Sequence, residues 1–229
     1  LSHMDAFAQN QWQNTGLVTT MLGQVEGFQD SNNTWVRKAI PYTQPPVGDL
    51  RWQAPQDPTP WTETLHETEF CNKCPQGTSA INPGPSESVI QGDEDCLYLN
   101  IWRPETDAKG LPVYFWIHGG SNIQGSADPY IGATIASRSN MVVVTINYRL
   151  GLLGWFTHPA LRETQDAVSG SGNYGTLDII KALDWVRNNI EAFGGNPQNI
   201  TVAGQSAGGV NDLSLMISPP AKGLFHRVI

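Results

Sequence analysis

Residues 200–209, with the sequence ITVAGQSAGG, constrain this chain more than any other stretch. A short apolar run leads into the pattern Gly-x-Ser-x-Gly, and residues 210–216 have the composition of a helix. A serine between two glycines at a strand-to-helix junction lies in a tight, strained turn that exposes its hydroxyl at the end of a sheet. There a base and a substrate can approach the Ser206 oxygen from different sides. The pattern alone is equally compatible with an ordinary glycine-rich turn.

The composition limits the classes of function. The 229 residues suffice for one large domain or two small ones, and 13 basic against 21 acidic residues give a net charge of −8. The basic residues are scattered, so we expect no nucleic-acid partner. No stretch approaches the roughly 20 apolar residues of a transmembrane helix. Cys71 and Cys74 have the spacing of a metal or redox pair, but no second pair follows, so we expect neither metal nor cofactor.

The N-terminal residues and two sequons bear on processing and export. Residues 1–4, LSHM, resemble an expression-vector remnant, so we expect residues 1–8 to be disordered and outside the fold. The sequons at Asn32 and Asn199 and a small-x-small pattern at 6–8 are compatible with secretion and glycosylation. No apolar leader precedes that pattern. We therefore expect a secreted glycoprotein.

The first half of the chain is rich in loops. Two β-prone runs, 17–28 and 34–40, flank a polar turn and predict an antiparallel hairpin. Residues 40–95 carry many prolines and no periodicity, and we expect the Ser/Pro/Gly-rich window 77–92 to be mobile. An alternating strand is predicted at 95–102.

The second half alternates strands and helices. Three nearly continuous apolar runs are typical of strands buried on both faces of a parallel sheet, at 111–117, 141–146 and 200–203. A short helix is predicted at 128–139, and an amphipathic helix carries apolar residues from Leu177 to Ile190 before glycines 194–195 end it. Residues 151–172 are predicted as loop. This order predicts an α/β fold with right-handed crossovers.

Eight ordered motifs resemble the type-B carboxylesterase and cholinesterase family of the α/β-hydrolase fold. They are PPVGDLRW (45–52), EDCLYLN (94–100), HGG (118–120), NYRLG (147–151), ALDWV (182–186), FGGNP (193–197), GQSAGG (204–209) and GLFHR (223–227). The resemblance implies a mostly parallel central sheet with helices on both faces and an N-terminal antiparallel hairpin. It also implies that residues 9–229 are the N-terminal portion of a single domain, which a downstream segment completes.

The resemblance assigns roles around Ser206. Ser206 is the expected nucleophile, and the N–H groups of Gly120, Ser121 and Ala207 are the expected oxyanion-hole donors. Each such donor typically contributes about 3 kcal/mol of transition-state stabilisation. Family members usually carry glycine where this chain has Ser121. We therefore expect the serine side chain to narrow the part of the substrate pocket that holds the acyl group.

Other motif residues are expected to be structural. His118 fits a structural histidine better than a catalytic base. Glu94, Asp95 and Arg149 resemble a family ion-pair cluster that ties the early strand to the sheet. The three cysteines leave one thiol over. By resemblance, the disulfide joins Cys74 to the cysteine of the EDC motif, Cys96.

The residues after Ser206 do not complete a catalytic triad. In this fold the acid and the histidine follow the serine, but only Asp212 and His226 do so here. Asp212 lies about 9 Å further along the helix axis, and His226 belongs to a structural segment of the family. We reject both, and expect a remaining C-terminal segment of the same enzyme to supply the acid and the histidine. Residues 1–229 alone are therefore expected to be inactive.

Two functions remain in view. The leading hypothesis is a serine esterase that hydrolyses a small-molecule carboxylic ester through an acyl-enzyme on Ser206. The alternative is a catalytically silent adhesion or scaffold protein of the same family. A neutral, non-choline ester is the expected substrate, because cholinesterases carry a glutamate where this chain has Gln205, a substrate-binding candidate. The segment 74–96 also contains no aromatic residue to contact a quaternary ammonium.

Overall fold

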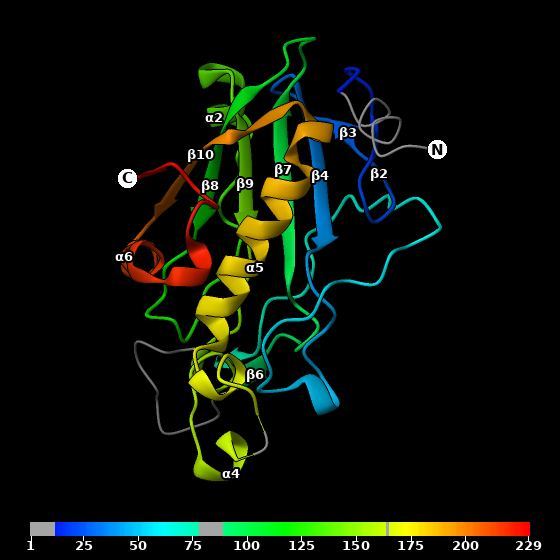
Figure 1. The fold of residues 1–229 in the computed structure, drawn as a ribbon. Helices are drawn as coiled ribbons and strands as arrows, with labels where there is room; N and C mark the ends of the chain where they lie inside the picture. Colours follow the sequence, from blue (N-terminus) through cyan, green and yellow to red (C-terminus); the bar gives the residue numbers. More distant parts are fainter. Residues whose placement is uncertain (1–11, 78–88, 164) are drawn as a thin grey trace, which may run out of the picture.

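A computed structural model describes residues 12–77, 89–163 and 165–229 (Figure 1). The expected disorder of residues 1–8 and most of the expected mobile window 77–92 lie outside these residues. No helix among the described residues is long and apolar enough to cross a bilayer.

A seven-stranded mixed sheet forms the centre, in the order β11-β10-β8-β9-β7-β4-β3. Its strands are β3 (Phe28–Gln29), β4 (Thr34–Pro41), β7 (Tyr98–Pro104), β8 (Leu111–Ile117), β9 (Val142–Ile146), β10 (Gly195–Gly204) and β11 (Arg227–Val228). Neighbours from β9 through β8 and β10 to β11 are parallel. Neighbours from β9 through β7 and β4 to β3 are antiparallel. The three predicted apolar runs thus form the parallel half.

The N-terminal run divides into two short pairings. β3 and β4 form the predicted antiparallel hairpin, but the expected first strand is interrupted, and β1 (Leu17–Thr19) pairs with β2 (Gln24–Glu26) in a sheet of their own. The turn between them contains Gly23, where a Cβ would lie 2.3 Å from the Trp61 indole nitrogen. The chain can therefore turn tightly at this point only because no side chain is present.

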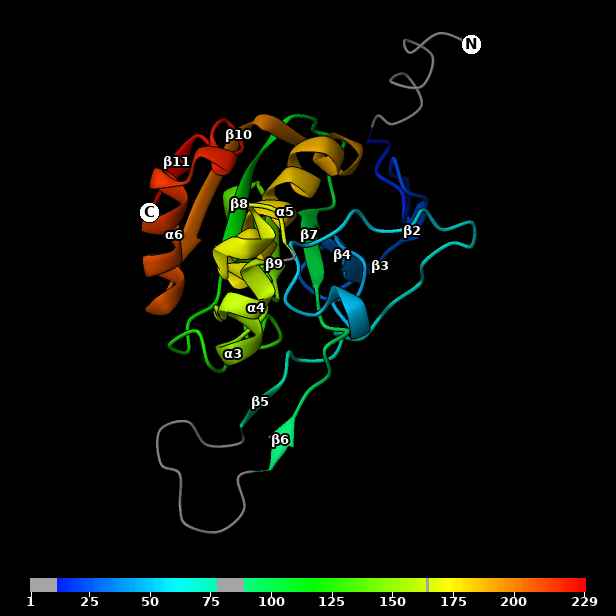
Figure 2. The same cartoon turned by 60° about the horizontal axis from the view of Figure 1, so that its bottom comes forward.

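Helices cover both faces of the sheet (Figures 1 and 2). α5 (Tyr174–Asn189) and α6 (Ala207–Ile217) lie on one face, and the short helix α2 (Ala133–Ser139) lies on the other. Alternate residues of β9 point to the two layers: Val144 belongs to the core beneath α5, and Val143 belongs to the core beneath α2. α2 begins later than residue 128, where the sequence predicts its start.

The segment 151–172, predicted as loop, contains helical turns. It holds α3 (Gly151–Gly154), α4 (Pro159–Arg162) and a 3-10 turn, η2 (Ser169–Ser171). α4 begins with proline at its first position, and the His158 ring nitrogen accepts a hydrogen bond from the Ala160 N–H. The remaining short elements are η1 (Gly48–Leu50), β5 (Gln76–Gly77), β6 (Ile90–Gln91), η3 (Ile190–Phe193) and η4 (Pro219–Ala221).

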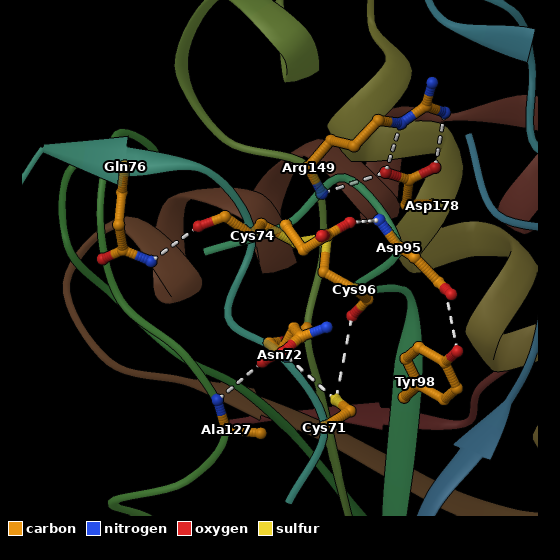
Figure 3. The surroundings of a disulfide bond; sticks show 12 residues. Cys71, Asn72, Cys74, Gln76, Asp95, Cys96, Tyr98, Ala127, Arg149 and Asp178 are labelled. Atoms are coloured by element: carbon orange, nitrogen blue, oxygen red, sulfur yellow. Dashed lines mark hydrogen bonds and ion pairs between the residues drawn. A yellow bond between two sulfur atoms is a disulfide. The ribbon is translucent and has the colours of Figure 1, made fainter. Parts of the chain in front are cut away.

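The Cys74–Cys96 disulfide is present, as the family resemblance implies (Figure 3). Both half-cystines are buried, and Cys96 lies two residues before β7. Cys71 is a free thiol, and the Asn147 side-chain amide donates a hydrogen bond to its sulfur at 3.5 Å. Burial raises the pKa of this thiol to about 12, so it is held as the neutral form.

The expected ion-pair cluster of Glu94, Asp95 and Arg149 is wrong. Glu94 pairs with Arg51, and Asp95 accepts a hydrogen bond from the hydroxyl of a β7 tyrosine at 2.8 Å. Arg149 instead binds Asp178 of α5 through two side-chain contacts of 2.6 and 2.8 Å (Figure 3). This pair is fully buried, where the planar guanidinium and the carboxylate satisfy each other. Arg149 therefore ties the end of β9 to α5.

Candidate active site

Ser206 lies at a sharp junction between β10 and α6. The strand ends at Gly204 and the helix begins at Ala207, so two residues make the turn. Ser206 has φ 56° and ψ −119°, a left-handed φ that non-glycine residues rarely adopt. Such a backbone costs about 1–3 kcal/mol. The side chain is exposed at the carboxyl end of the parallel strands.

The flanking glycines are required by close backbone approach. A Cβ at Gly204 would lie 2.3 Å from the carbonyl carbon of Gly208, and a Cβ at Gly208 would lie 2.1 Å from the Ile117 oxygen. Neither glycine has a positive φ. The pattern Gly-x-Ser-x-Gly thus brings the first turn of α6 directly against β8 and β10.

The loop that follows β8 touches this turn. A Cβ at Gly119 would lie 2.5 Å from the Gln205 carbonyl oxygen and 3.1 Å from the Ser206 Cβ. The Gln205 N–H also donates to the Ile117 oxygen at 3.3 Å. Gln205 is exposed, and its side-chain oxygen lies beside Gly119. The structure therefore brings together two motifs that are more than 80 positions apart in the sequence.

Three backbone N–H groups at this contact are free. Gly120 has φ 107° and Ser121 has φ 58°, so the loop turns sharply at both residues. Within the described part of the chain, the N–H groups of Gly120, Ser121 and Ala207 have no hydrogen-bond acceptor. Unpaired donors beside an exposed hydroxyl can bind a developing negative charge.

Three side chains that sequence analysis did not single out hold this loop. The Gln76 amide accepts from the Gly125 N–H at 2.8 Å and donates to the Gly125 carbonyl at 2.9 Å. The Asn122 and Asn211 amides bond to each other. Their positions carry no local pattern, because each depends on a neighbour that is distant in the sequence.

His118 is a structural histidine here. Its buried ring stacks on Tyr148 with centroids 4.4 Å apart, and its Nδ1 lies 2.7 Å from the Gly119 oxygen. Burial lowers the pKa of His118 to about 4, so the ring is neutral at physiological pH. The Tyr148 hydroxyl donates to the His118 carbonyl at 2.7 Å. His118 fixes the start of the loop and presents no base to Ser206.

No described residue supplies a base to the Ser206 hydroxyl, which has no hydrogen-bond partner in residues 12–77, 89–163 and 165–229. Four histidines fall in these ranges, and each contacts another group. They are His66 (carboxylate, 2.6 Å), His118 (carbonyl, 2.7 Å), His158 (N–H, 3.2 Å) and His226 (N–H, 3.2 Å).

The two candidates downstream of the serine are unsuitable, in agreement with the sequence. His226 bonds to the Ile200 N–H, six residues before Ser206 along β10, which is about 20 Å away at the rise of a strand. Asp212 is buried on α6, and neither carboxylate oxygen has a hydrogen-bond partner among the described residues. Among these same residues, no three His, Cys, Asp or Glu side chains form a group that could hold a metal ion.

The comparisons with known proteins agree with this geometry. The model of the carboxylesterase family matches residues 14–229. The chain is 43% identical to para-nitrobenzyl esterase of Bacillus subtilis over 216 residues, covering 93% of this chain and 42% of that protein. It is also 43% identical to fumonisin B1 esterase of Sphingopyxis macrogoltabida, covering 92% of this chain and 38% of that protein.

Solved structures show the same fold. A PNB esterase superposes with a TM-score of 0.83 at 39% identity, covering 94% of this chain and 43% of that one. A carboxylesterase of Geobacillus stearothermophilus superposes with a TM-score of 0.79 at 39% identity, covering 93% of this chain and 42% of that one. The chain thus spans about two fifths of the length of the relatives it matches, and it has the α/β-hydrolase fold. The family match covers nearly all of its sequence: the chain belongs to the carboxylesterase family.

Proposed function

We propose that this chain carries the nucleophile and the oxyanion hole of a serine esterase. The observation that supports this is the direct contact between the loop after β8 and the Ser206 turn, with free N–H groups on both sides. The Ser206 oxygen attacks the carbonyl carbon of a carboxylic ester, and its proton passes to a base. The N–H groups of Gly120, Ser121 and Ala207 hold the resulting oxyanion.

Collapse of this intermediate expels the alcohol, which takes up the proton, and leaves an acyl group on Ser206. Water then attacks the acyl-enzyme and releases the acid. The base and its orienting carboxylate come, in this proposal, from a later segment of the same polypeptide. The greater length of the relatives supports it. A catalytically silent protein would not need the strained Ser206 backbone or the free donors, so the esterase is the better reading.

Covalent labelling tests this function. The protein is expressed from its complete coding sequence, treated with a fluorophosphonate and mapped by peptide mass spectrometry. We expect one adduct, on Ser206, and loss of both labelling and ester turnover in Ser206→Ala. Ser214→Ala, two turns further along α6, is the matched control and should keep both. Labelling of another serine, or turnover in Ser206→Ala, would contradict the assignment.

The proposed substrate is a neutral ester. Gln205 places an uncharged amide beside the nucleophile, and the segment 74–96 contributes no aromatic face to a cation. Butyrylcholine and its uncharged isostere 3,3-dimethylbutyl butyrate separate the possibilities, since they differ only in the charge of the alcohol. We expect no preference for the choline ester, and a tenfold higher kcat/KM for it would reverse this proposal.

Export and glycosylation complete the proposal. A disulfide is typical of oxidising compartments. Asn32 is exposed at the turn of the β3–β4 hairpin, whereas Asn199 lies in β10 and accepts a hydrogen bond from Arg227. Asn32 is therefore the better glycan acceptor. A mobility shift on glycosidase treatment that Asn32→Gln removes supports this, and an unshifted wild-type protein from a eukaryotic host rejects it.

A further inference from the structure

Two asparagines link the loop after β8, which carries the proposed oxyanion-hole donors Gly120 and Ser121, to α6, the helix that follows Ser206. The Asn122 Nδ2 donates to the Asn211 Oδ1 at 3.2 Å, and the Asn211 Nδ2 donates to the Asn122 Oδ1 at 3.0 Å. Asn122 is two residues after Gly120, and Asn211 is five residues after Ser206. The reciprocal pair therefore joins the two elements that carry the free donors and the hydroxyl.

Asn122 is also fixed by its surroundings. Its backbone has φ 59°, its carbonyl accepts from the Gly151 N–H at 2.7 Å, and its side-chain oxygen lies 3.2 Å from the Tyr148 hydroxyl. Asn211 is 3% exposed, so its amide faces little competition from water. Each amide thus has a defined partner, and rotation of either one would break both hydrogen bonds of the pair.

We propose that Asn122 and Asn211 are positioning residues that set the distance between the oxyanion-hole donors and Ser206. This inference rests on the proposed esterase function. An oxyanion hole works only when its donors stand about 2.7–3.1 Å from the position of the oxyanion. The loop carries two of the three donors, and α6 begins with the third. A tie between loop and helix fixes their separation, so its loss weakens binding of the transition state more than binding of the substrate.

The size of the effect follows from geometry. A misplacement of about 1 Å at a reacting centre can lower the rate about 100-fold. The contacts of Gly119 with the Ser206 turn and of Gln76 with Gly125 remain when the amide pair is removed. We therefore expect a loss of about tenfold, smaller than the loss of a donor itself.

Three variants and a control test the pair in the complete protein. Asn211→Ala removes one amide beside a cavity of about 540 Å³ that both asparagines line, so it opens onto existing space. Asn122→Gly removes the other amide and tolerates the positive φ. The third variant combines the two changes. Asn188→Ala is the matched control, because that exposed amide donates to Asp184 on its own helix.

The readouts are kcat and KM per titrated active site, and affinity for a trifluoromethyl ketone, whose serine adduct places an oxyanion in the hole. We expect each single variant to lower kcat and trifluoromethyl ketone affinity by a similar factor of about ten, with KM within about twofold. The double variant should lose about tenfold in kcat rather than 100-fold, because the two changes remove the same amide pair. The control should not change.

The outcomes separate this inference from the proposed function. A wild-type protein with no ester turnover and no ketone binding overturns both. An active wild-type protein whose variants keep kcat per titrated site, with only a lower melting temperature, overturns the positioning role alone. Multiplicative losses in the double variant also overturn it, since they would mean that the two asparagines act separately.

Discussion

Ser121 lies in the loop after β8, at a position where the family resemblance leads us to expect glycine in the proposed oxyanion hole. It is exposed, with a φ of 58° that glycine adopts without strain. Ser121→Gly should relax the loop and remove a side chain from the acyl side of the site. We expect turnover of bulky acyl esters to rise more than turnover of acetyl esters. Measurement of kcat/KM for a p-nitrophenyl ester series checks this, and an equal change across the series would show that the side chain points elsewhere.

Asp212 makes the free energy of unfolding depend on pH. Burial raises the pKa of its carboxyl group from an ordinary value of 3.8 to about 7 in the folded state. Between these values the folded state keeps a proton that the unfolded state releases. The free energy of unfolding therefore falls as pH rises through this window, and stays lowered above it.

Asp212→Asn should remove this loss. We expect the variant to be more stable than the wild type at about pH 8, with a difference that shrinks towards about pH 4. Urea unfolding across this range measures it, with the exposed Asp49→Asn as control. A less stable variant at the higher pH would mean that Asp212 gains a donor from residues outside those described.

Some site residues are fixed by a short stretch of sequence, and others are fixed by contacts between elements distant in the sequence. Gly204, Ser206 and Gly208 were predictable because a tight strand-to-helix turn imposes its requirements within five positions. Asn122 and Asn211 were not predictable, because an amide pair depends on two elements meeting in the folded chain. The same holds for Arg149, which the sequence assigned to the wrong carboxylates.

The junction of α6 with β8 depends on one close approach. A Cβ at Gly208 would lie 2.1 Å from the Ile117 oxygen, whereas a Cβ at the next residue, Gly209, would be 3.4 Å from its nearest neighbour. Gly208→Ala must push the helix from the sheet and should cost several times the roughly 1 kcal/mol that separates glycine from alanine in a helix. Gly209→Ala is the control and should be neutral or stabilising. Equal effects in thermal unfolding would contradict the contact.

The disulfide secures the segment between Cys74 and β7, from which β5 and β6 extend away from the sheet (Figure 2). It closes a loop across a sequence separation of 22, worth about 3 kcal/mol on a loop-entropy estimate. Cys96→Ser should lower the free energy of unfolding by about that amount. Cys71→Ser, which removes the free thiol, should cost much less. Non-reducing peptide mapping that found Cys71 in a bridge would contradict the pairing.

Elements with strong periodicity were predictable, and short ones were not. β8, β9 and α5 follow from apolar runs and a helical stripe, because their burial repeats along the element. α3 and α4 span four residues each, so they hold too few positions to show a period. The turn of α4 has a proline at its first position and a ring-nitrogen cap, whereas α3 has neither.

The described molecule exposes an apolar helix face. The face consists of residues spaced at i, i+3, i+6 and i+7 on α6, and they are 59–83% exposed: Val210, Leu213, Met216 and Ile217. Such a face promotes association in water. Residues 12–229 expressed alone should therefore self-associate, and a Leu213→Lys/Ile217→Lys variant should be more monomeric by light scattering. Leu152→Lys, at an exposed position away from α6, should not help. A monomeric wild-type segment would contradict this.

The backbone conformation of Ser206 sets the stability of the fold against the proposed chemistry. A residue held at φ 56° and ψ −119° is a standing cost to the fold, and glycine would adopt that conformation with less strain. Without the proposed catalysis, an exchange of Ser206 for glycine would therefore raise the free energy of unfolding at no functional cost. A serine at this position lowers the free energy of unfolding, and its hydroxyl is the proposed nucleophile. The strained serine therefore fits the proposed nucleophile better than a purely structural turn.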